Sequence, residues 1–526
     1  MSNTVHRKLW TSLFCPTSIA PLVQFRIALG FILLWEAYRY IAHDWPQLLH
    51  LDPSFHFKYA RFDWVEPLPH DLHHTVFPLL AVLALALIVG LIYRAAALLL
   101  FIGWAYVFLI DQALYLNHLY LVLIILGLMI FLPAHRAFSF DVLWRERLRA
   151  TVVPRWTIDI LRFQIALVYI YGGIAKLNGD WLSGVPMQMM LLEKSRLLGQ
   201  WAGEPELALL FAYGGVLLDL GIIPLLCWKR TRILGLLLAA IFHIANHLLF
   251  QIGIFPWMML AATIILWPPR SLTLLGLGRL YGGLVLAGMI ATWLTHSADL
   301  PEPAIEPWAW LLALVAAAIL IFPPDAWKQL SFENPDVTTA PRFRTRPLAL
   351  ALLMLFASWQ ILMPLRHFLY PGDVSWTEQG HKWAWHMKLR VKLADRATFF
   401  IRDQQGNLLE RVNPFAPNSP LTLWQAETMA TRPDMVLEFA HYLRDRAQAK
   451  YHQPVKVTVN DTVSLNGRPF QRIIDPEADL ASIEPRLWPP ASWIEPLTTP
   501  RRQLGRVNVD QVMGRFDYIE TVAPRR

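Results

Sequence analysis

The stretch Leu161–Met187, LRFQIALVYIYGGIAKLNGDWLSGVPM, decides how this chain folds. It begins as a long apolar run, reaches Lys176, and continues at once into a polar segment that carries Trp181. The residues from Arg162 to Lys176 would climb roughly 22 Å as an α-helix, against a bilayer core of about 30 Å. The stretch therefore predicts a membrane helix that holds the Lys176 amine near one face of the bilayer.

The Lys176 amine has two interpretations. Lysines at the ends of membrane helices usually extend to the lipid headgroups and do no chemistry. Alternatively, an amine that is shielded from water is more easily a free base at neutral pH, and it can then take a proton from a bound substrate. Position alone favours the first interpretation, so the choice depends on the rest of the chain.

Composition places the chain among integral membrane proteins. Of its 526 residues, 55% are hydrophobic and only 16% are charged. The first apolar run contains Arg26 and Glu36 and is not followed by a small-residue cleavage site, so no removable signal peptide is expected. Cys15 and Cys227 cannot build a disulfide framework or a cysteine metal site. The net charge of +8 is spread between the apolar runs, which fits membrane orientation and not nucleic-acid binding.

Apolar runs and basic loops predict the topology. The runs lie near residues 20–40, 75–93, 95–110, 117–133, 157–176, 207–227, 233–252, 254–268, 280–295, 307–322 and 347–365, which allows about eight to eleven crossings. Lys and Arg residues cluster in alternate connections, and these are expected to be cytoplasmic. The loops 41–74, 111–117, 177–206 and 296–306, and everything after residue 366, should then lie outside. In a bacterium this corresponds to the inner membrane, with the periplasm outside.

The composition changes near Arg366. Alternating and β-branched runs flank the turn signals Gln404–Asn407 and Asn466–Gly467, and Leu421–Tyr451 has a helical pattern. Met387–Leu393 and Ala397–Asp403 are predicted as separate extended runs. The expected architecture is a polytopic α-helical membrane domain over residues 1–365. A soluble, mainly β (α+β) extracytoplasmic domain is expected over residues 366–526.

Polar residues from separate segments converge on the outer side of this topology. Asn117 and His118 begin one span, His243 and His247 share one face of another, and His367 follows the last crossing. Each has a structural alternative: Asn is a good helix N-cap, and histidines in spans often hydrogen-bond between helices. Polar groups inside a span are costly, however, which modestly favours a functional site.

A metal site is the competing interpretation of the histidines. His70, His73 and His74, together with the His243 pair, resemble two of the histidine boxes of membrane di-iron oxygenases, but there is no third box. A bis-histidine haem would need ligands from two facing helices, and the pattern selects no such pair. We therefore expect no metal.

Several motifs carry a family resemblance. In chain order they are FHFKYARFDWVEPLP (55–69), LNHLYL, RFQIALVYIYGGIAKLNGDW, FHIANHLLFQIGIFPWMML, HFLYPGDVSWTEQG, LNGRPFQRIIDPEADL and ASWIEPL. On these motifs the chain resembles, between about residues 16 and 497, the vitamin K-dependent gamma-glutamyl carboxylase family.

The resemblance implies a reaction. Lys176 corresponds to the family residue that deprotonates reduced vitamin K, which is a menaquinol or phylloquinol. Oxygenation of the quinol with O2 produces a base that removes a γ-proton of a peptide glutamate, CO2 adds to give γ-carboxyglutamate, and the quinone leaves as its epoxide. The protein would thus be a carbon–carbon lyase with epoxidase activity, with a peptide or protein glutamate as substrate and membrane lipid and quinone as its other partners.

The resemblance also implies site residues. The catalytic group comprises Lys176, His118, His243 and His367. Asn117, His118, Lys176 and Met387 would bind the quinone, and His367, Trp376, His381 and Trp385 would contact the peptide.

The chain departs from the animal enzymes where the peptide would be handled. His381 stands where they have tyrosine, His386 and Lys388 flank Met387, and their disulfide between the two domains cannot form. One alternative is therefore a quinol oxygenase that does not carboxylate, and another is a non-enzymatic membrane scaffold.

Overall fold

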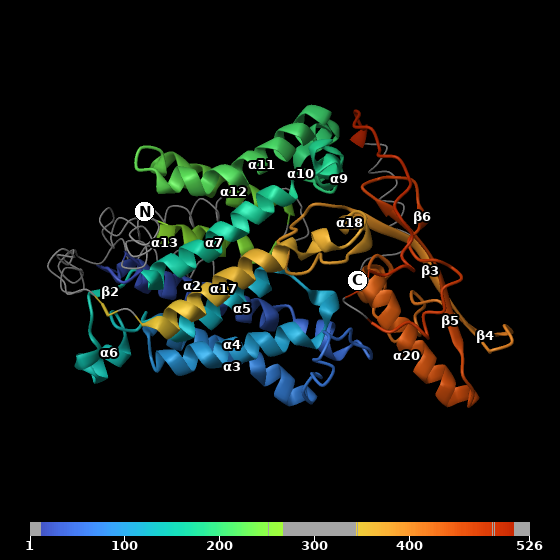
Figure 1. The fold of residues 1–526 in the computed structure, drawn as a ribbon, viewed down its shortest axis with the longest axis horizontal. Helices are drawn as coiled ribbons and strands as arrows, with labels where there is room; N and C mark the ends of the chain where they lie inside the picture. Colours follow the sequence, from blue (N-terminus) through green and yellow to red (C-terminus); the bar gives the residue numbers. More distant parts are fainter. Residues whose placement is uncertain are drawn as a thin grey trace.

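The computed structural model describes residues 12–250, 252–266, 343–344, 346–485, 488 and 490–509. Figure 1 shows a bundle of long helices with a sheet-and-helix domain at one end of it. The predicted spans near 280–295 and 307–322 lie outside the described residues. The domain boundary after residue 365 remains a prediction.

Seven described helices are long and apolar enough to cross a membrane, which confirms the predicted helical membrane domain. They are α2 (Ala20–Ala42), α3 (His70–Val89), α4 (Tyr93–Ile110), α7 (Trp156–Ala175), α11 (Pro205–Cys227), α12 (Arg232–Phe250) and α17 (Pro347–Leu365), the last running into η5 (Arg366–Leu369). Two apolar helices are shorter, α5 (Asn117–Phe131) and α13 (Phe255–Leu266).

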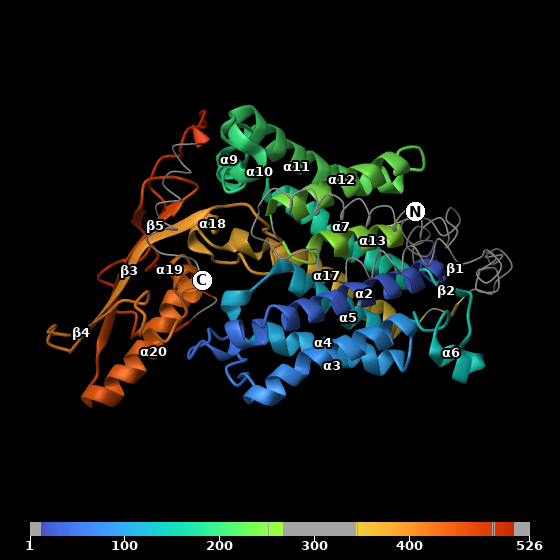
Figure 2. The ribbon, with the colours of Figure 1, turned by 180° about the vertical axis from the view of Figure 1, so that it is seen from behind.

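Short elements connect these helices. They are β1 (Pro16–Ser18), η1 (Pro46–Leu51), η2 (Gln112–Leu114), α6 (Phe140–Trp144), η3 (Glu146–Leu148), β2 (Val152–Pro154), α8 (Gly179–Leu182), α9 (Val185–Leu192), α10 (Ser195–Leu198) and η4 (Gly199–Gly203). Figures 1 and 2 agree in placing α11 and α12 at one edge of the bundle and α3 and α4 at the opposite edge. The helix that carries Lys176 at its end, α7, lies between these edges.

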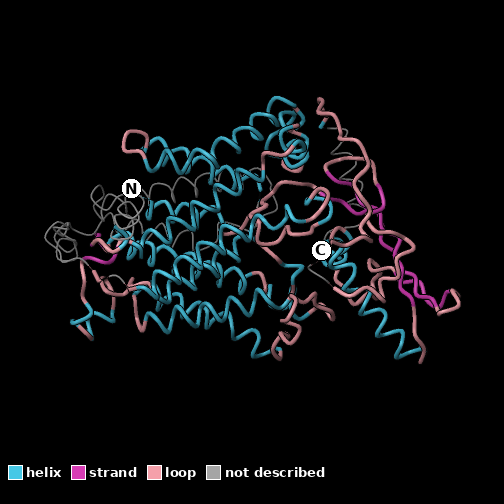
Figure 3. Tube along the Cα trace, in the orientation of Figure 1, coloured by secondary structure: helices cyan, strands magenta, loops and turns pink. Residues whose placement is uncertain are grey.

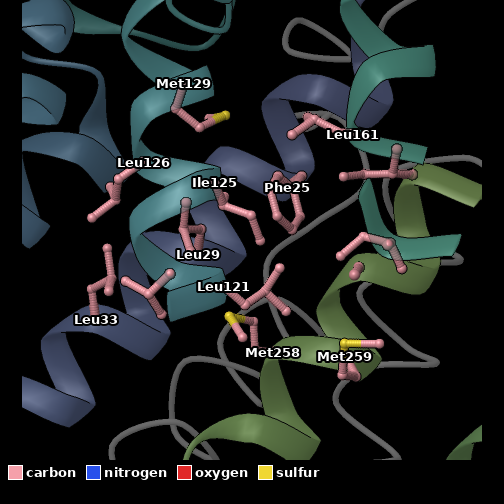
Figure 4. Packing of buried hydrophobic residues seen from close by; sticks show 14 of the residues in the cluster. Phe25, Leu29, Leu33, Leu121, Ile125, Leu126, Met129, Leu161, Met258 and Met259 are labelled. Atoms are coloured by element: carbon pink, nitrogen blue, oxygen red, sulfur yellow. The ribbon is translucent and has the colours of Figure 1, made fainter. Parts of the chain in front are cut away.

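The centre of the bundle is close-packed and apolar. Side chains of α2, α5, α7 and α13 meet there, as Figure 4 shows for Phe25, Ile125, Leu161 and Met258. Burial of such side chains against one another is worth about 1.5–3 kcal/mol each relative to water. Separated helices in lipid would also be shielded from water, so within the membrane the helices associate through close packing of these side chains. The core therefore fixes the position of α7 relative to α2 and α5.

Arg26 lies in the first half of α2 and is a charged residue at the edge of this apolar core. Its side chain is completely buried and donates to carbonyl oxygens of Ala134 (2.8 Å), Ala137 (3.2 Å) and Ile88 (3.2 Å), and also to that of Phe138. Three of these carbonyls belong to the connection between α5 and α6, and that of Ile88 belongs to the last turn of α3. Arg26 therefore holds the helix connections together, since its charge is satisfied by main-chain oxygens.

Three of the predicted outer loops contact the C-terminal domain. Ser54 donates to the carbonyl of Pro420 (3.1 Å), Gln112 Nε2 to Glu438 Oε2 (2.7 Å), and Gln188 Nε2 to the carbonyl of Gly505 (2.7 Å). The loops 41–74, 111–117 and 177–206 therefore lie on one side of the bundle, together with the C-terminal domain. This agrees with the sidedness that the basic loops predicted.

The outer domain contains an antiparallel sheet with strand order β4-β3-β5-β6. Its strands are β3 (Lys392–Arg402), β4 (Leu408–Val412), β5 (Lys456–Leu465) and β6 (Gln471–Arg472). Figure 3 shows strands only here and in the short β1–β2 pair, among the residues described. In the register, Phe399 pairs with Val459, and both are buried because alternate residues of each strand face the helices.

Two helices cover this sheet. They are α19 (Leu423–Ala430) and α20 (Pro433–Tyr451), preceded by the one-turn α18 (Val374–Thr377). Thr422 and Gln425 form a capping box that begins α19, and Pro433 at the first turn of α20 separates two helices where the sequence predicted one. The α+β class of the domain is thus confirmed.

The predicted strand over Met387–Leu393 was largely wrong. β3 begins only at Lys392, and the segment before it is irregular, with positive φ at Trp383 (66°), Trp385 (58°) and Lys388 (49°). Such φ values prevent an extended strand. The irregular backbone turns this aromatic segment back towards the membrane helices.

Candidate functional site

Lys176 directly follows the last residue of α7 and is buried within the protein, with 8% of its surface exposed. Its Nζ donates to Asp219 Oδ2 on α11 at 2.5 Å and to the carbonyl of Gly172 at 3.3 Å. The amine therefore lies between two helices instead of extending to the lipid headgroups.

Glycines in α7 allow this approach. A Cβ added at Gly173 would lie 2.6 Å from Leu220 Cδ2, and one at Gly172 would lie 3.4 Å from Asp219 Oδ2. A side chain at Gly173 would displace at least the Leu220 side chain, so the pair Gly172–Gly173 permits the close packing on α11 in which the amine reaches the carboxylate.

The sequence prediction missed Asp219. This residue is 5% exposed and is the single acidic residue of the apolar run 207–227. A lone carboxylate in a span is costly enough to require a partner, which is the signal that could have identified it. Among the described residues, that partner is Lys176, whose Nζ lies 2.5 Å from Asp219 Oδ2.

Met387 reaches the same helix from the outer domain. A Cβ added at Gly172 would lie 3.3 Å from Met387 Cε, so the methionine packs on the turn whose carbonyl accepts from Lys176. Trp385, two residues earlier, is fully buried, and its ring lies 5.2 Å from that of Tyr120 on α5. The Nε1 of Trp385 has no hydrogen-bond partner among the described residues.

Asn117 is hydrogen-bonded to this aromatic segment. Its Nδ2 donates to the carbonyl of His386 at 3.1 Å, and its Oδ1 accepts from the Tyr115 hydroxyl at 3.0 Å. The side chain of Asn117 thus bonds to the outer domain and does not cap α5, whose N-cap is Leu116 without a side-chain hydrogen bond.

His118 lies on the other side of this helix start. A Cβ added at Gly253 would be 3.5 Å from His118 Nε2 and 3.2 Å from Arg39 Nη1, so both groups converge on that glycine. Gly253 also has φ +56°, which favours glycine at this position. Arg39 pairs with Glu36 at 2.9 Å. The position of the Glu36–Arg39 pair beside His118 could not be predicted from the sequence, because the pair lies on α2 and His118 lies on α5.

His243 contacts α7 through a tyrosine. Its Nε2 and the Tyr169 hydroxyl are 2.6 Å apart, and its Nδ1 has no partner among the described residues. Tyr169 lies about two helical turns before Lys176. His243 therefore contacts α7 about two helical turns before Lys176, and among the described residues its hydrogen bond is to Tyr169.

Three histidines form a row at the start of the outer domain. The ring centroids of His367 and His386 are 4.8 Å apart, and those of His386 and His381 are 5.3 Å apart. Burial, together with the nearby His367 and the Arg390 and Arg366 charges, lowers the pKa of His386 to about 3. Burial and the Arg390 charge hold the pKa of His381 well below its usual range. Both rings are thus neutral at pH 7.

Two predicted peptide contacts belong to internal networks instead. His381 accepts from Arg390, which also pairs with Glu378 at 2.6 Å. Trp376 is completely buried, and its Nε1 donates to the carbonyl of Glu495 at 2.7 Å. Both side chains thus have partners within the outer domain; Trp376 is fully covered, whereas His381 is partly exposed.

The histidines of the di-iron alternative have separate partners. His73 contacts His50 (3.0 Å) and the Tyr106 hydroxyl (3.0 Å), while His243 contacts Tyr169. Among the described residues no group of three or more His, Cys, Asp or Glu could hold a metal. A hollow of about 430 Å³ beside Gln200 and Arg506 shares no lining residue with the site around Lys176.

The fold and the site together define a class: a polytopic helical membrane protein whose outer α+β domain inserts an aromatic segment between the ends of its spans. The HTTM domain family matches residues 14–270, and the family described as "Vitamin K-dependent gamma-carboxylase, lumenal domain" matches residues 345–500. Together, the two matches agree with the vitamin K-dependent gamma-carboxylase family. No solved structure matches it.

Proposed function

We propose that the protein carboxylates glutamate residues of a peptide or protein, using a reduced vitamin K quinone, O2 and CO2, at the outer face of a bacterial inner membrane. The observation that carries the proposal is the buried Lys176–Asp219 pair, on which Met387 from the outer domain converges. The family matches support the same chemistry.

The residues present fit a planar quinone. Tyr120, Trp385 and Met387 supply aromatic and flexible apolar surface. Trp385 Nε1 and His386 Nδ1 are buried and have no partner among the described residues, so they could bond to the oxygens of a ligand. Asn117, which already bonds to the segment that carries Trp385 and His386, and His118 at the next position of α5 would hold the quinone oxygens, as the family resemblance implies.

The reduced quinone, when bound, would supply electrons, O2 would be the oxidant, and their reaction would supply the strong base that glutamate carboxylation requires. The chain's own contribution begins at Lys176 Nζ, which would accept the quinol hydroxyl proton. The Lys176–Asp219 pair carries no net charge whether its proton lies on Nζ or on Oδ2. Accepting one further proton gives the pair a charge of +1, which would stabilise the negative oxygen opposite it.

The remaining residues would orient this centre. His243 holds Tyr169 on α7, and His367 lies in the histidine row where the peptide glutamate would enter. A neutral imidazole can donate or accept a hydrogen bond without adding charge, which suits a site where an anion forms.

The test is quinol-dependent transfer of labelled CO2 to a glutamate peptide by the purified full-length protein. Lys176→Met should abolish both labelling and epoxide formation, a loss of at least a hundredfold, because general bases contribute about 10²–10⁴-fold. Lys229→Met is the matched control, since Lys229 is exposed at the turn after α11. Lys176→Met protein that keeps more than a tenth of either activity would contradict the proposal.

A second candidate, a quinol oxygenase that does not carboxylate, has its own support. His381 and Trp376 are occupied by internal contacts, while the quinone-side groups converge at Gly172 and Asn117. Epoxide formation that depends on Lys176, without labelled CO2 uptake across varied peptides, would select this alternative.

A further inference from the structure

The turn Leu465–Arg468, at the end of β5, is hydrogen-bonded to the segment that carries Met387. Asn466 and Gly467 have φ of +53° and +71°, the left-handed conformation that a tight Asn-Gly turn requires. The N–H of Asn466 donates to the carbonyl of Val391 at 2.8 Å, and Asn466 Oδ1 accepts from the N–H of Val391 at 2.9 Å. Asn466 therefore anchors the chain four residues after Met387.

The same turn binds a carboxylate of the membrane domain. Arg468 donates from Nη1 to Asp180 Oδ2 and from Nη2 to Asp180 Oδ1, each at 2.6 Å, and Asn466 Nδ2 donates to Asp180 Oδ2 at 2.7 Å. Asp180, Asn466 and Arg468 are all buried. A bidentate guanidinium–carboxylate pair fixes both distance and orientation, so α8 and the turn are held in one geometry.

Asp180 is linked in turn to Lys176. Asn178 Oδ1 accepts from the N–H groups of Asp180 (3.0 Å) and Trp181 (2.9 Å), and Asn178 Nδ2 donates to the carbonyl of Ala175 at the end of α7 (2.8 Å). The Trp181 ring lies 5.6 Å from Lys176 Nζ. Its Nε1 donates to the carbonyl of Ala212 on α11, the helix that carries Asp219.

We propose that Arg468 is a positioning residue that sets Lys176 against Met387, by holding α8 through Asp180 while the same turn holds Val391. The inference rests on the proposed function for its kinetic consequence. It extends that function because Arg468 lies in the outer domain and touches no reacting group. A misplacement of about 1 Å at a reacting centre can cost about a hundredfold in rate.

The experiment compares Arg468→Met and Arg468→Lys with Arg472→Met in the full-length protein. Arg472 is exposed on β6 of the same domain and serves as the matched control. Arg468→Met should lower the kcat of reduced-quinone oxidation at least tenfold and change the quinone KM less than twofold. Arg468→Lys should recover part of the loss because it keeps the charge, and Arg472→Met should behave as the unsubstituted protein.

Hydrogen exchange supplies a readout that does not depend on the reaction. Arg468→Met should speed exchange over residues 176–182 and leave exchange within β3 and β5 unchanged. Should Arg468→Met not accumulate as folded protein, Arg468→Lys and Asp180→Asn give the same comparison.

Three outcomes decide the matter. Slower turnover with faster exchange at 176–182 supports the proposal. Folded Arg468→Met with normal kcat, or with normal exchange at 176–182, overturns it. Full activity in Lys176→Met would overturn the proposed function instead, and exchange would still report whether Arg468 holds α8.

Discussion

Asp180 and Asp219 are both buried carboxylates paired with a cation, but their surroundings differ. Asp180 accepts from Asn466 and from both terminal nitrogens of Arg468, and it also forms an ion pair with Arg501 at 2.9 Å. Asp219 has one side-chain partner among the described residues, the Lys176 amine, which also donates weakly to a carbonyl. A carboxylate held by a guanidinium fork keeps its charge and fixes structure, because arginine does not lose its proton. A lysine–carboxylate pair can exchange a proton, and this suits it to chemistry.

The largest effect expected from this comparison is at Asp219. Asp219→Leu leaves the Lys176 amine buried without its acid, and unpairing a buried charge costs about 3–5 kcal/mol. The double variant Lys176→Met with Asp219→Leu should recover most of that stability, since apolar residues of similar volume often replace buried pairs at little cost. Thermal unfolding of the purified proteins measures both.

The control is activity, which the double variant should not recover. A double variant less stable than Asp219→Leu would show that the pair matters for packing and not for mutual neutralisation.

The next effect is at Asp180. Burial opposes its ionisation, but hydrogen bonds from Arg468 and Asn466 and the charges of Arg468 and Arg501 lower its pKa below the usual 3.8. A carboxyl whose pKa is lower in the folded than in the unfolded protein stabilises the fold at pH values above its unfolded-state pKa. This stabilisation is lost as the pH falls below about 4. Asp180→Asn should therefore lower stability at pH 7 by about 2 kcal/mol and reduce the loss on acidification.

Unfolding temperatures at pH 7 and at pH 3.5 test this prediction. An Asp180→Asn protein with the same pH dependence as the unsubstituted protein would show that other carboxylates govern acid unfolding.

The smallest effect concerns the histidine row. The pKa of His386 is lowered to about 3, mainly by burial, so the unfolded chain binds its proton first as the pH falls below about 6.5. Stability should consequently fall by about 1.5 kcal/mol between pH 6.5 and pH 5, because the slope approaches about 1.4 kcal/mol per pH unit below pH 6.5. His386→Gln should flatten that part of the stability profile. An unchanged profile in this variant would assign the dependence to other groups.

Lys176, Asn117 and Met387 show how much of the site could be predicted. Each was chosen from a motif, and each lies where the outer loops meet the outer domain. Trp376 and His381 came from motifs as well, yet they contact the domain's own interior. A motif identifies a segment, but which atom of the segment faces a ligand depends on backbone turns such as those at Trp383, Trp385 and Lys388.

Asp219 and Arg468 mark the limit of prediction from sequence. Asp219 lies 43 residues from Lys176, and Arg468 lies 288 residues from Asp180. Apolar periodicity records which residues leave water, and it contains no information about which distant partner a buried charge meets. The Asn466–Gly467 turn was predicted because its φ requirement is local, whereas its contact with Asp180 was not.

The sequence by itself determined the membrane domain, the common side of the outer loops, the α+β class of the outer domain and the family. Hydrophobic runs, basic loops and turn residues act locally, so these features can be read along the chain. Only the tertiary structure decided that the Lys176 amine meets a carboxylate within the bundle, and that a turn of the outer domain holds both Asp180 and Val391. The physical reason is that a buried charge must be neutralised by whatever group the packed helices bring within about 3 Å of it.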